Sequence, residues 1–311
     1  MGDVVLPLLF VLAVAVYYSG VRALTLAAVS VLSCLTFEYL YRRVLRKSRS
    51  VGDLSAVVTG LLTAFCMPVT APLWFPVLGA FFSIVVVKQL FGGLGRNVFN
   101  PAAAAVCMLT VTWPGVMSAF PLPTHASSPL PAFATPQAFD TGRTVLSMLK
   151  SGVLPSDSFS DLLFGYTPGN LGTTPILVLC VVALVLLYRR IINWQTPAAF
   201  LGTVAAAALL FPRCPSGRLD SMLYELMSGS LLFVAAFMAT DPVTSPVTRA
   251  GRFLYGLGCG LFTVVLRYYG IYPEGAFFAV LLMNPFVLPL DRLGWKWKVQ
   301  RAKGGLIHEE A

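Results

Sequence analysis

Five ionisable side chains lie in or beside long apolar stretches and are the first candidates for chemistry: Glu38, Lys88, Asp241, Arg267 and Glu274. A charge at the centre of a bilayer costs roughly 2.5–3.5 kcal/mol on insertion scales, so such a residue is a functional candidate by default. Lys88 and Arg267 lie near the ends of their stretches, where long side chains reach the headgroups. This position favours an anchor or a phosphate contact over a buried charge. Asp241 precedes a proline, so its alternative role is to end a helix.

Two Asn-Pro pairs, Asn100-Pro101 and Asn284-Pro285, place amide side chains beside backbone groups that proline leaves free. Such amides are suited to hydrogen-bonding a polar ring system, or they cap helices. The glycine-rich turn that ends in Arg96 brings bare N–H groups to a helix start, which is suited to an anion. The turn has neither the G-x-G-x-x-G pattern after a strand nor a P-loop, so it does not indicate nucleotide binding of those kinds.

Metal-assisted and hydrolytic chemistry find little support in the sequence. The 6 cysteines are far apart without a C-x-x-C pair, and the 2 histidines, His125 and His308, are not near a cysteine cluster. The cysteines are typical of small buried hydrophobes, and no zinc or haem site is indicated. No Ser-His-Asp triad or pair of hydrolytic carboxylates is recognisable. We therefore predict no catalytic side chain and no metal site.

The elements that position these residues are membrane helices. The chain is 57% hydrophobic and 11% charged, too apolar for one water-soluble core. The net charge of +9 resides in short basic clusters between apolar spans, which is typical of membrane orientation rather than nucleic-acid binding. We predict an all-α integral membrane protein with about ten transmembrane helices, at approximately 3–18, 22–41, 54–67, 72–90, 98–117, 173–188, 194–212, 221–240, 251–269 and 274–290.

Most of the 22 basic residues fall on one side of these spans if the cluster from Arg42 to Arg49 is cytoplasmic. This assigns both termini, including the tail 293–311, to the cytoplasm. The first apolar run lacks a basic n-region and a cleavage site, so we expect a retained helix rather than a signal peptide. The long connection 118–172, rich in Pro, Ser, Thr and Gly, then faces outward. It is either a functional loop or a slack linker.

A short motif occurs twice: PVTAP from Pro68 to Pro72, and PVTSP from Pro242 to Pro246, which contains Thr244. Each copy follows an apolar span, and five spans lie on either side of the long connection. An odd number of spans per repeat predicts two inverted five-helix repeats, 1–117 and 173–292. The prolines predict broken helices at a central cavity, where other protein groups or water must satisfy the freed backbone; alternatively, they only punctuate loops.

Four strings together resemble one family. They are SAVVTGLL from Ser55, GGLGRNVFNPAA from Gly92, MATDPVTSPVT from Met238, and YPEG from Tyr272 followed by LMN from Leu282. In this order they resemble the RnfD subunit of the Rnf electron-transport complex, a family related to NqrB of the sodium-pumping NADH:quinone oxidoreductase. The resemblance runs from about residue 20 to residue 292.

The resemblance implies a subunit of a bacterial inner-membrane complex that couples electron transfer between ferredoxin and NAD to Na+ or H+ movement. Its partners would be the other Rnf subunits, a flavinyltransferase and membrane lipid, with no nucleic acid. The related NqrB has a fold like the urea and ammonium channels. FMN would be attached to a threonine of the external loop through a phosphoester, and a second, non-covalent flavin is left open.

The matching threonine is Thr135, in the string Phe-Ala-Thr-Pro. The family's Asp six residues earlier and Ser or Thr three residues earlier are Pro129 and Ala132 here, so Thr173 and Thr174 are alternative attachment points. A flavin carries one or two electrons, and the protein must bind and orient it. The predicted cofactor-binding residues are Thr135, Lys88, Arg96, Asn100, Asp241, Thr244, Glu274 and Asn284.

Two other classes of protein suit the same sequence features. A stand-alone channel or permease for a small polar solute would also have inverted repeats and broken helices. A purely structural membrane subunit would accompany redox partners but lack flavin. We expect Asp241→Asn or Glu274→Gln to impair coupling or flavin retention if the redox interpretation holds.

Overall fold

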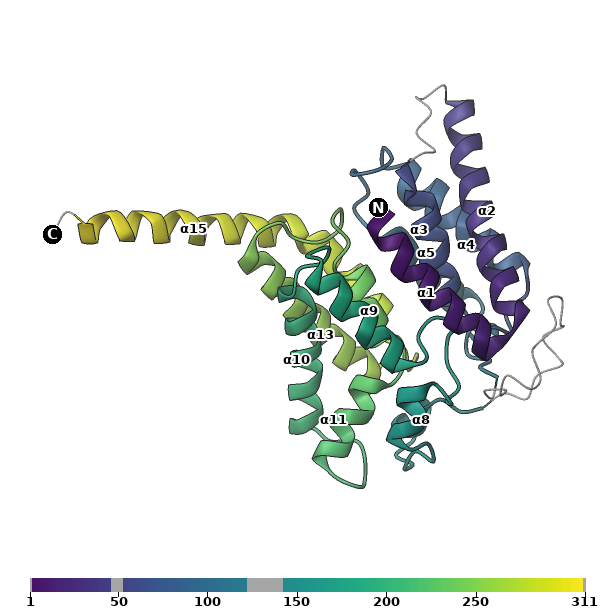
Figure 1. Ribbon diagram of the computed structural model, residues 1–311. Helices are drawn as coiled ribbons and strands as arrows, with labels where there is room; N and C mark the ends of the chain where they lie inside the picture. Colours follow the sequence, from purple (N-terminus) through teal and green to yellow (C-terminus); the bar gives the residue numbers. More distant parts are fainter. Residues whose placement is uncertain (1, 46–52, 122–141, 310–311) are drawn as a thin grey trace.

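The computed structural model describes residues 2–45, 53–121 and 142–309, with side chains up to residue 299. Regular structure within these ranges is helical (Figure 1), as the apolar pattern predicts. In the first half the helices are α1 (Gly2–Ser19), α2 (Val21–Val44), α3 (Ser55–Phe65), α4 (Trp74–Phe81) continued by the π-helical η2 (Phe82–Gln89), and α5 (Pro101–Thr112). Each coincides with an expected span.

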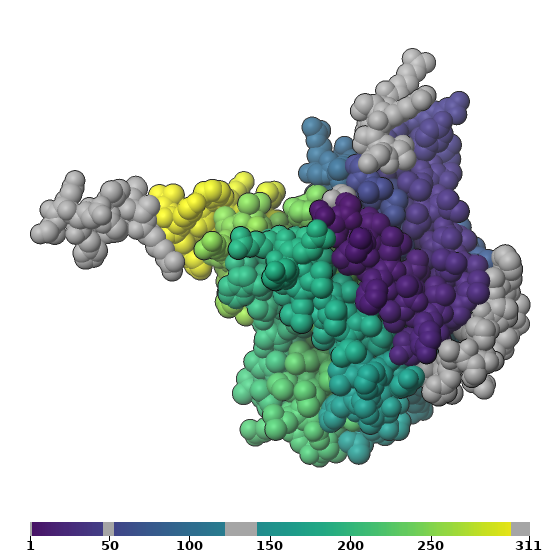
Figure 2. All heavy atoms as spheres, in the orientation of Figure 1, coloured from purple at the N-terminus to yellow at the C-terminus, as the bar shows by residue number. Residues whose placement is uncertain are grey.

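The second half contains helices at the other five expected spans. They are α9 (Ile176–Tyr188), α10 (Gln195–Leu210), α11 (Arg218–Met227), α12 (Leu231–Phe233) continued by the π-helical η4 (Val234–Met238), α13 (Arg249–Tyr269), and α14 (Ala276–Met283) joined through η5 (Asn284–Phe286) to α15 (Val287–Glu309). Figure 2 shows the two halves on different sides of the molecule. They meet where α1 contacts α9 and where α5 contacts α14.

The surface of the helical body is unusually apolar for a protein in water. Leu6 on α1, Leu32 on α2, Leu184 on α9 and Leu261 on α13 are each at least 59% exposed. Large apolar side chains on the outside of many helices indicate a lipid environment. The fold is therefore that of a multi-pass membrane protein.

Three helices in the described ranges are long and apolar enough to cross a membrane: Gly2–Ser19, Val21–Val44 and Ala276–Val299. The bent pair of α11 and Leu231–Met238 makes a fourth if it forms one span. Other apolar helices are short. With 11 residues, α3 is about 16 Å long at 1.5 Å per residue, roughly half of a ~30 Å hydrocarbon core. Ten crossings and an inverted arrangement stay predictions.

Both proline motifs lie in the connections between helices rather than inside helices, which agrees with the second of the two interpretations. Their backbone groups nevertheless meet protein partners, as membrane depth requires. The Arg22 guanidinium donates to Val69 O at 3.4 Å and to Ala71 O at 2.8 Å. In the second copy, Asn284 Nδ2 donates to Thr244 O at 3.1 Å. The helix break in this half comes earlier, because α11 and Leu231–Met238 meet at 61°.

The connection 118–172 is not slack throughout. Its described part contains α7 (Val145–Lys150) and α8 (Phe159–Phe164), and α6 (Pro114–Met117) directly precedes it. Val145, Leu149 and Leu162 form a small buried cluster with Tyr224 of α11. This part of the connection is therefore built onto the second half. Thr135 lies outside the described residues.

The segment from residue 293, for which we expected a tail, belongs to the helix α15. In Figure 1, α15 projects away from the helical body. Its base is held at the start of α13, because the Asp291 carboxylate accepts hydrogen bonds from Val247 N and Thr248 N at 2.8–3.0 Å. This carboxylate caps the N-terminus of α13, where negative charge is favourable.

Candidate functional site

Several cavities lie between the halves of the protein, and we name two of them after one lining residue each. The Asn100 cavity has a volume of about 250 Å³. The first half lines it with α3, Lys88 and the start of α5, and the second half with the end of η4 and Asp241. It is mostly apolar with a few convergent polar groups, which is the usual character of a ligand site.

Asn100 caps a helix and also joins the two halves. Its Oδ1 accepts hydrogen bonds from Ala102 N and Ala103 N, both at 3.1 Å, and so caps α5. Its Nδ2 donates to Met238 O at 3.3 Å. Its backbone N–H donates to Asn284 Oδ1 at 2.9 Å. The capping interpretation of this Asn-Pro pair is confirmed, and the amide is already engaged by protein groups.

Asn284 and Thr244 lie next to this network. Asn284 Nδ2 donates to the Tyr255 hydroxyl at 2.9 Å as well as to Thr244 O. The Thr244 hydroxyl donates to Asp241 Oδ2 at 2.8 Å. Asp241 lines the Asn100 cavity. The structure thus brings together four predicted site residues, Asn100, Asp241, Thr244 and Asn284, as one hydrogen-bonded group.

Lys88 is a buried charge, so the expectation that favoured an anchor or a phosphate contact over a buried charge was wrong. Its side chain is 3% exposed, and its Nζ donates to both Glu38 oxygens at 3.0 and 3.1 Å and to Ser55 Oγ at 2.6 Å. The ammonium group is therefore held by one carboxylate and one hydroxyl. The same carboxylate also pairs with Arg42 at 2.8 Å and accepts from Gln89 Nε2 at 2.9 Å.

Arg267 is also buried, at 1% exposure, and the same expectation was wrong for it. Its Nη1 lies 2.8 Å from Glu225 Oε2, and Arg213 Nη1 lies 3.0 Å from Glu225 Oε1. A lysine or arginine near the end of a span reaches the headgroups only if no carboxylate is closer. Here a neighbouring helix supplies one in each case.

Arg96 lies apart from the other predicted residues. It is exposed, it does not line the Asn100 cavity, and α5 begins five residues later at Pro101. The preceding turn closes on η2, since Gly93 N donates to Lys88 O at 3.0 Å. This turn contains Gly92, Gly93 and Gly95, all with positive φ, a conformation for which glycine is the natural residue. The turn therefore does not bring its N–H groups to a helix start.

The second cavity, the Glu274 cavity, has a volume of about 370 Å³. Its wall includes two residues of the long connection, Phe120 and Gly142, which are joined by a 2.9 Å hydrogen bond from Gly142 N to Phe120 O. Arg143 and Asn170 also line it. Asn170 is buried, and its Oδ1 has no hydrogen-bond partner. A buried acceptor without a donor is costly unless a ligand or water meets it.

Glu274 itself contacts the broken helix of the second half. Its Oε2 accepts a hydrogen bond from Ser230 N at 3.1 Å and a short one from the Ser230 hydroxyl. Ser230 directly precedes α12. The carboxylate thus caps the buried segment Leu231–Met238, where the helix dipole favours negative charge.

Several site residues were not recognised from the sequence. Three of them bind a candidate site residue: Glu225 pairs with Arg267, Ser230 donates to Glu274, and Tyr255 accepts from Asn284. The fourth is Asn170, whose Oδ1 has no partner. Glu225 was a recognisable candidate, since it is an acid four residues before the break at Gly229. The other three are common residue types, and only their burial and their partners single them out.

The sequence as a whole matches the family model described as NQR2, RnfD, RnfE family over residues 1–297. The chain belongs to this family. It is 41% identical over 287 residues to the D-type subunit of the Na(+)-translocating ferredoxin:NAD(+) oxidoreductase complex of Acetobacterium woodii, covering 91% of this chain and 85% of that relative. The resemblance found in the sequence motifs is confirmed.

Two further relatives are similar to the chain over comparable lengths. The D-type subunit of the ion-translocating oxidoreductase complex of Halorhodospira halophila is 35% identical, over 89% of this chain and 84% of the relative. The D-type subunit of the proton-translocating ferredoxin:NAD(+) oxidoreductase complex of Clostridium ljungdahlii is 31% identical, over 89% and 84%. The coupling ions in the names of these relatives thus differ.

Proposed function

We propose that this chain is the D-type membrane subunit of a complex that couples electron transfer between ferredoxin and NAD to Na+ or H+ movement across the bacterial inner membrane. The observation that carries this proposal is the 41% identity over 91% of the chain to a subunit so named. The apolar exterior agrees with it, as do the cavities between the halves, each of which has a few polar residues in a mostly apolar lining. The subunit acts within the complex rather than alone.

We propose further that the chain carries FMN on Thr135 and that the Glu274 cavity receives the flavin. Thr135 is seven residues from Gly142, which lines this cavity. Seven extended residues reach at most about 25 Å. A cavity of about 370 Å³ falls in the range of roughly 300–1,000 Å³ that small ligands and cofactors occupy.

The lining of the Glu274 cavity suits a flavin. Asn170 Oδ1 is a buried acceptor that needs a donor, and an isoalloxazine ring offers an N–H group. Arg143 supplies a positive charge at the wall, beside the point where the connection returns. When bound, FMN supplies one- and two-electron transfer, while this chain binds and orients it.

The Asn100 cavity suits a second flavin less well. Its volume of about 250 Å³ lies below the usual range for small ligands. Lys88 is paired with Glu38 and Ser55, and the Asn100 amide is engaged by the chain itself. The Asp241 carboxylate is likewise engaged, by the Thr244 hydroxyl and by backbone hydrogen bonds from Val243 and Thr244. We therefore assign the flavin to the Glu274 cavity.

In-gel flavin fluorescence after denaturing electrophoresis tests the attachment. The complex is co-expressed with a flavinyltransferase in four forms: wild type, Thr135→Ala, Thr173→Ala with Thr174→Ala, and the control Thr141→Ala in the same connection. We expect a fluorescent band in all but Thr135→Ala, with the modified peptide identified by mass spectrometry. A fluorescent band in Thr135→Ala would show that FMN is attached to another residue. A dark wild-type band contradicts covalent flavin, and solute transport by the chain alone would then favour a channel.

A further inference from the structure

The two cavities are separated by about one helical turn. On α3, Leu62 lines the Asn100 cavity, whereas Cys66, four residues later, lines the Glu274 cavity. On α5, Ala102 and Val106 divide between the two cavities in the same way. Four residues of helix rise about 6 Å. Because this layer of protein is thin, the side chains that fill it decide whether the two cavities stay separate.

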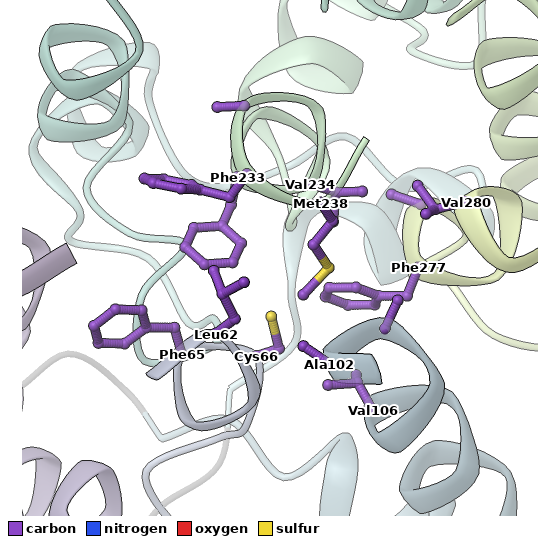
Figure 3. Packing of buried hydrophobic residues seen from close by; sticks show 14 of the residues in the cluster. Leu62, Phe65, Cys66, Ala102, Val106, Phe233, Val234, Met238, Phe277 and Val280 are labelled. Carbon is purple, nitrogen blue, oxygen red and sulfur yellow. The ribbon is translucent and has the colours of Figure 1, made fainter. Parts of the chain in front are cut away.

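The filling comes from the segment Leu231–Met238, which combines α12 and η4. Every residue of it except Leu232 is buried. The Phe233 ring contacts Phe65 edge to face, with centroids 6.0 Å apart, and Phe237 lines the Asn100 cavity. In Figure 3 the Cys66 thiol points toward Met238 and Phe277, which belong to the same buried cluster. The segment therefore lines the Asn100 cavity, and Met238 faces Cys66 and Phe277, which line the Glu274 cavity.

Both ends of the segment are held by residues outside it. At the N-terminal end, the Glu274 carboxylate accepts from the N–H and the hydroxyl of Ser230. At the C-terminal end, Asn100 Nδ2 donates to Met238 O. A carboxylate at a helix N-terminus and an N–H donor at its C-terminal carbonyl both match the helix dipole.

The two holding residues occupy related places in the two halves. Asn100 directly precedes α5, and Glu274 lies two residues before α14. Each lines a different cavity. A change in the Glu274 cavity can therefore act on the N-terminal end of the segment. A change in the Asn100 cavity can act on its C-terminal end.

We propose that Glu274 and Asn100 are positioning residues for Leu231–Met238, and that releasing either end of this segment joins the two cavities. The segment is then a closed partition in the described state. The proposal does not depend on flavin attachment, because its test reads the packing around Cys66 rather than electron transfer.

The test uses Cys66, which is a free, fully buried thiol in the partition. The intact complex is purified with the other cysteines of this chain replaced by alanine, and the rate of Cys66 alkylation by N-ethylmaleimide is measured by mass spectrometry. The variants are Glu274→Gln, Ser230→Ala and Asn100→Asp. Asn100→Asp keeps the Oδ1 that caps α5 and replaces the donor to Met238 O by a carboxylate oxygen, and Asn97→Asp is the control for the added charge. Each should raise the rate about tenfold, the factor expected for loss of one such hydrogen bond.

The controls separate release of the segment from general loosening. Tyr272→Phe alters the Glu274 cavity and Asn97→Asp alters the Asn100 cavity, and neither side chain bonds to the segment. Both should react at the wild-type rate. Asn100 lines only the other cavity, so a faster rate in Asn100→Asp does not come from widening the Glu274 cavity. Wild-type rates in Ser230→Ala and Asn100→Asp in an assembled complex would overturn the proposal, as would an equal increase in the controls.

Discussion

The two halves of this protein each bury a cation near the end of their fourth helical segment, but they use it differently. In the first half, Lys88 meets the Glu38 carboxylate and the Ser55 hydroxyl, both of which are side-chain partners. In the second half, Arg267 meets the Glu225 carboxylate and also donates to two backbone carbonyls, Glu225 O at 2.6 Å and Ser228 O at 3.1 Å.

The difference follows from what each cation must hold. Lys88 is a compact charge that joins α2, α3 and η2 through side chains. Arg267 reaches the last carbonyls of α11, just before the 61° bend. A planar guanidinium with several fixed donors suits this work better than an ammonium group. The broken helix therefore needs its arginine to donate hydrogen bonds to free backbone carbonyls, whereas the lysine cluster is a network of side chains.

The largest effect should come from Glu225→Leu. This change leaves Arg267 and Arg213 together without their carboxylate, and loss of one partner of a buried pair typically destabilises by roughly 3–5 kcal/mol. Denaturation of the purified complex in mixed micelles measures the loss. Asp220→Asn, on the same helix but making no ion pair in the described part of the chain, is the matched control. Equal stability of the two variants would contradict the ion-pair role.

A smaller difference should separate two paired replacements. Glu38→Leu with Lys88→Met removes both charges of a side-chain pair and leaves Arg42 without its carboxylate, just as loss of Glu225 leaves Arg213. Glu225→Leu with Arg267→Met also strips donors from Glu225 O and Ser228 O, each worth roughly 1–3 kcal/mol when buried. The same denaturation experiment compares the two. If the first double variant were the less stable one, the proposed contrast between the halves would be wrong.

The smallest effect should come from the exposed pair between α1 and α9. Arg189 and Asp3 are 54% and 68% exposed, with a separation of 4.0 Å. Solvent screens such a pair, so Asp3→Asn should change stability by less than about 0.5 kcal/mol. A loss comparable to that of Glu225→Leu would mean that burial does not set the scale of these effects.

Local patterns were sufficient for the elements but not for their partners. The apolar runs predicted α1, α2, α9 and α10 to within a few residues, because about twenty apolar residues in a row have few alternatives to a helix. The bend at Ser228–Ser230 was missed, although Gly229 with its positive φ lies there. A short apolar helix continuing beyond a bend has the same hydropathy as an unbroken span.

By itself, the sequence determined the lipid environment, the order of the helices, the proline-rich connections and membership of the NQR2, RnfD, RnfE family. Composition and motif order carry this information without reference to packing. Only the tertiary structure decided that Lys88 and Arg267 are buried, and that Asn100 and Glu274 hold opposite ends of one segment. Contacts across 40 to 140 residues depend on how helices pack in three dimensions, and a linear pattern does not specify which side chain arrives beside a buried charge.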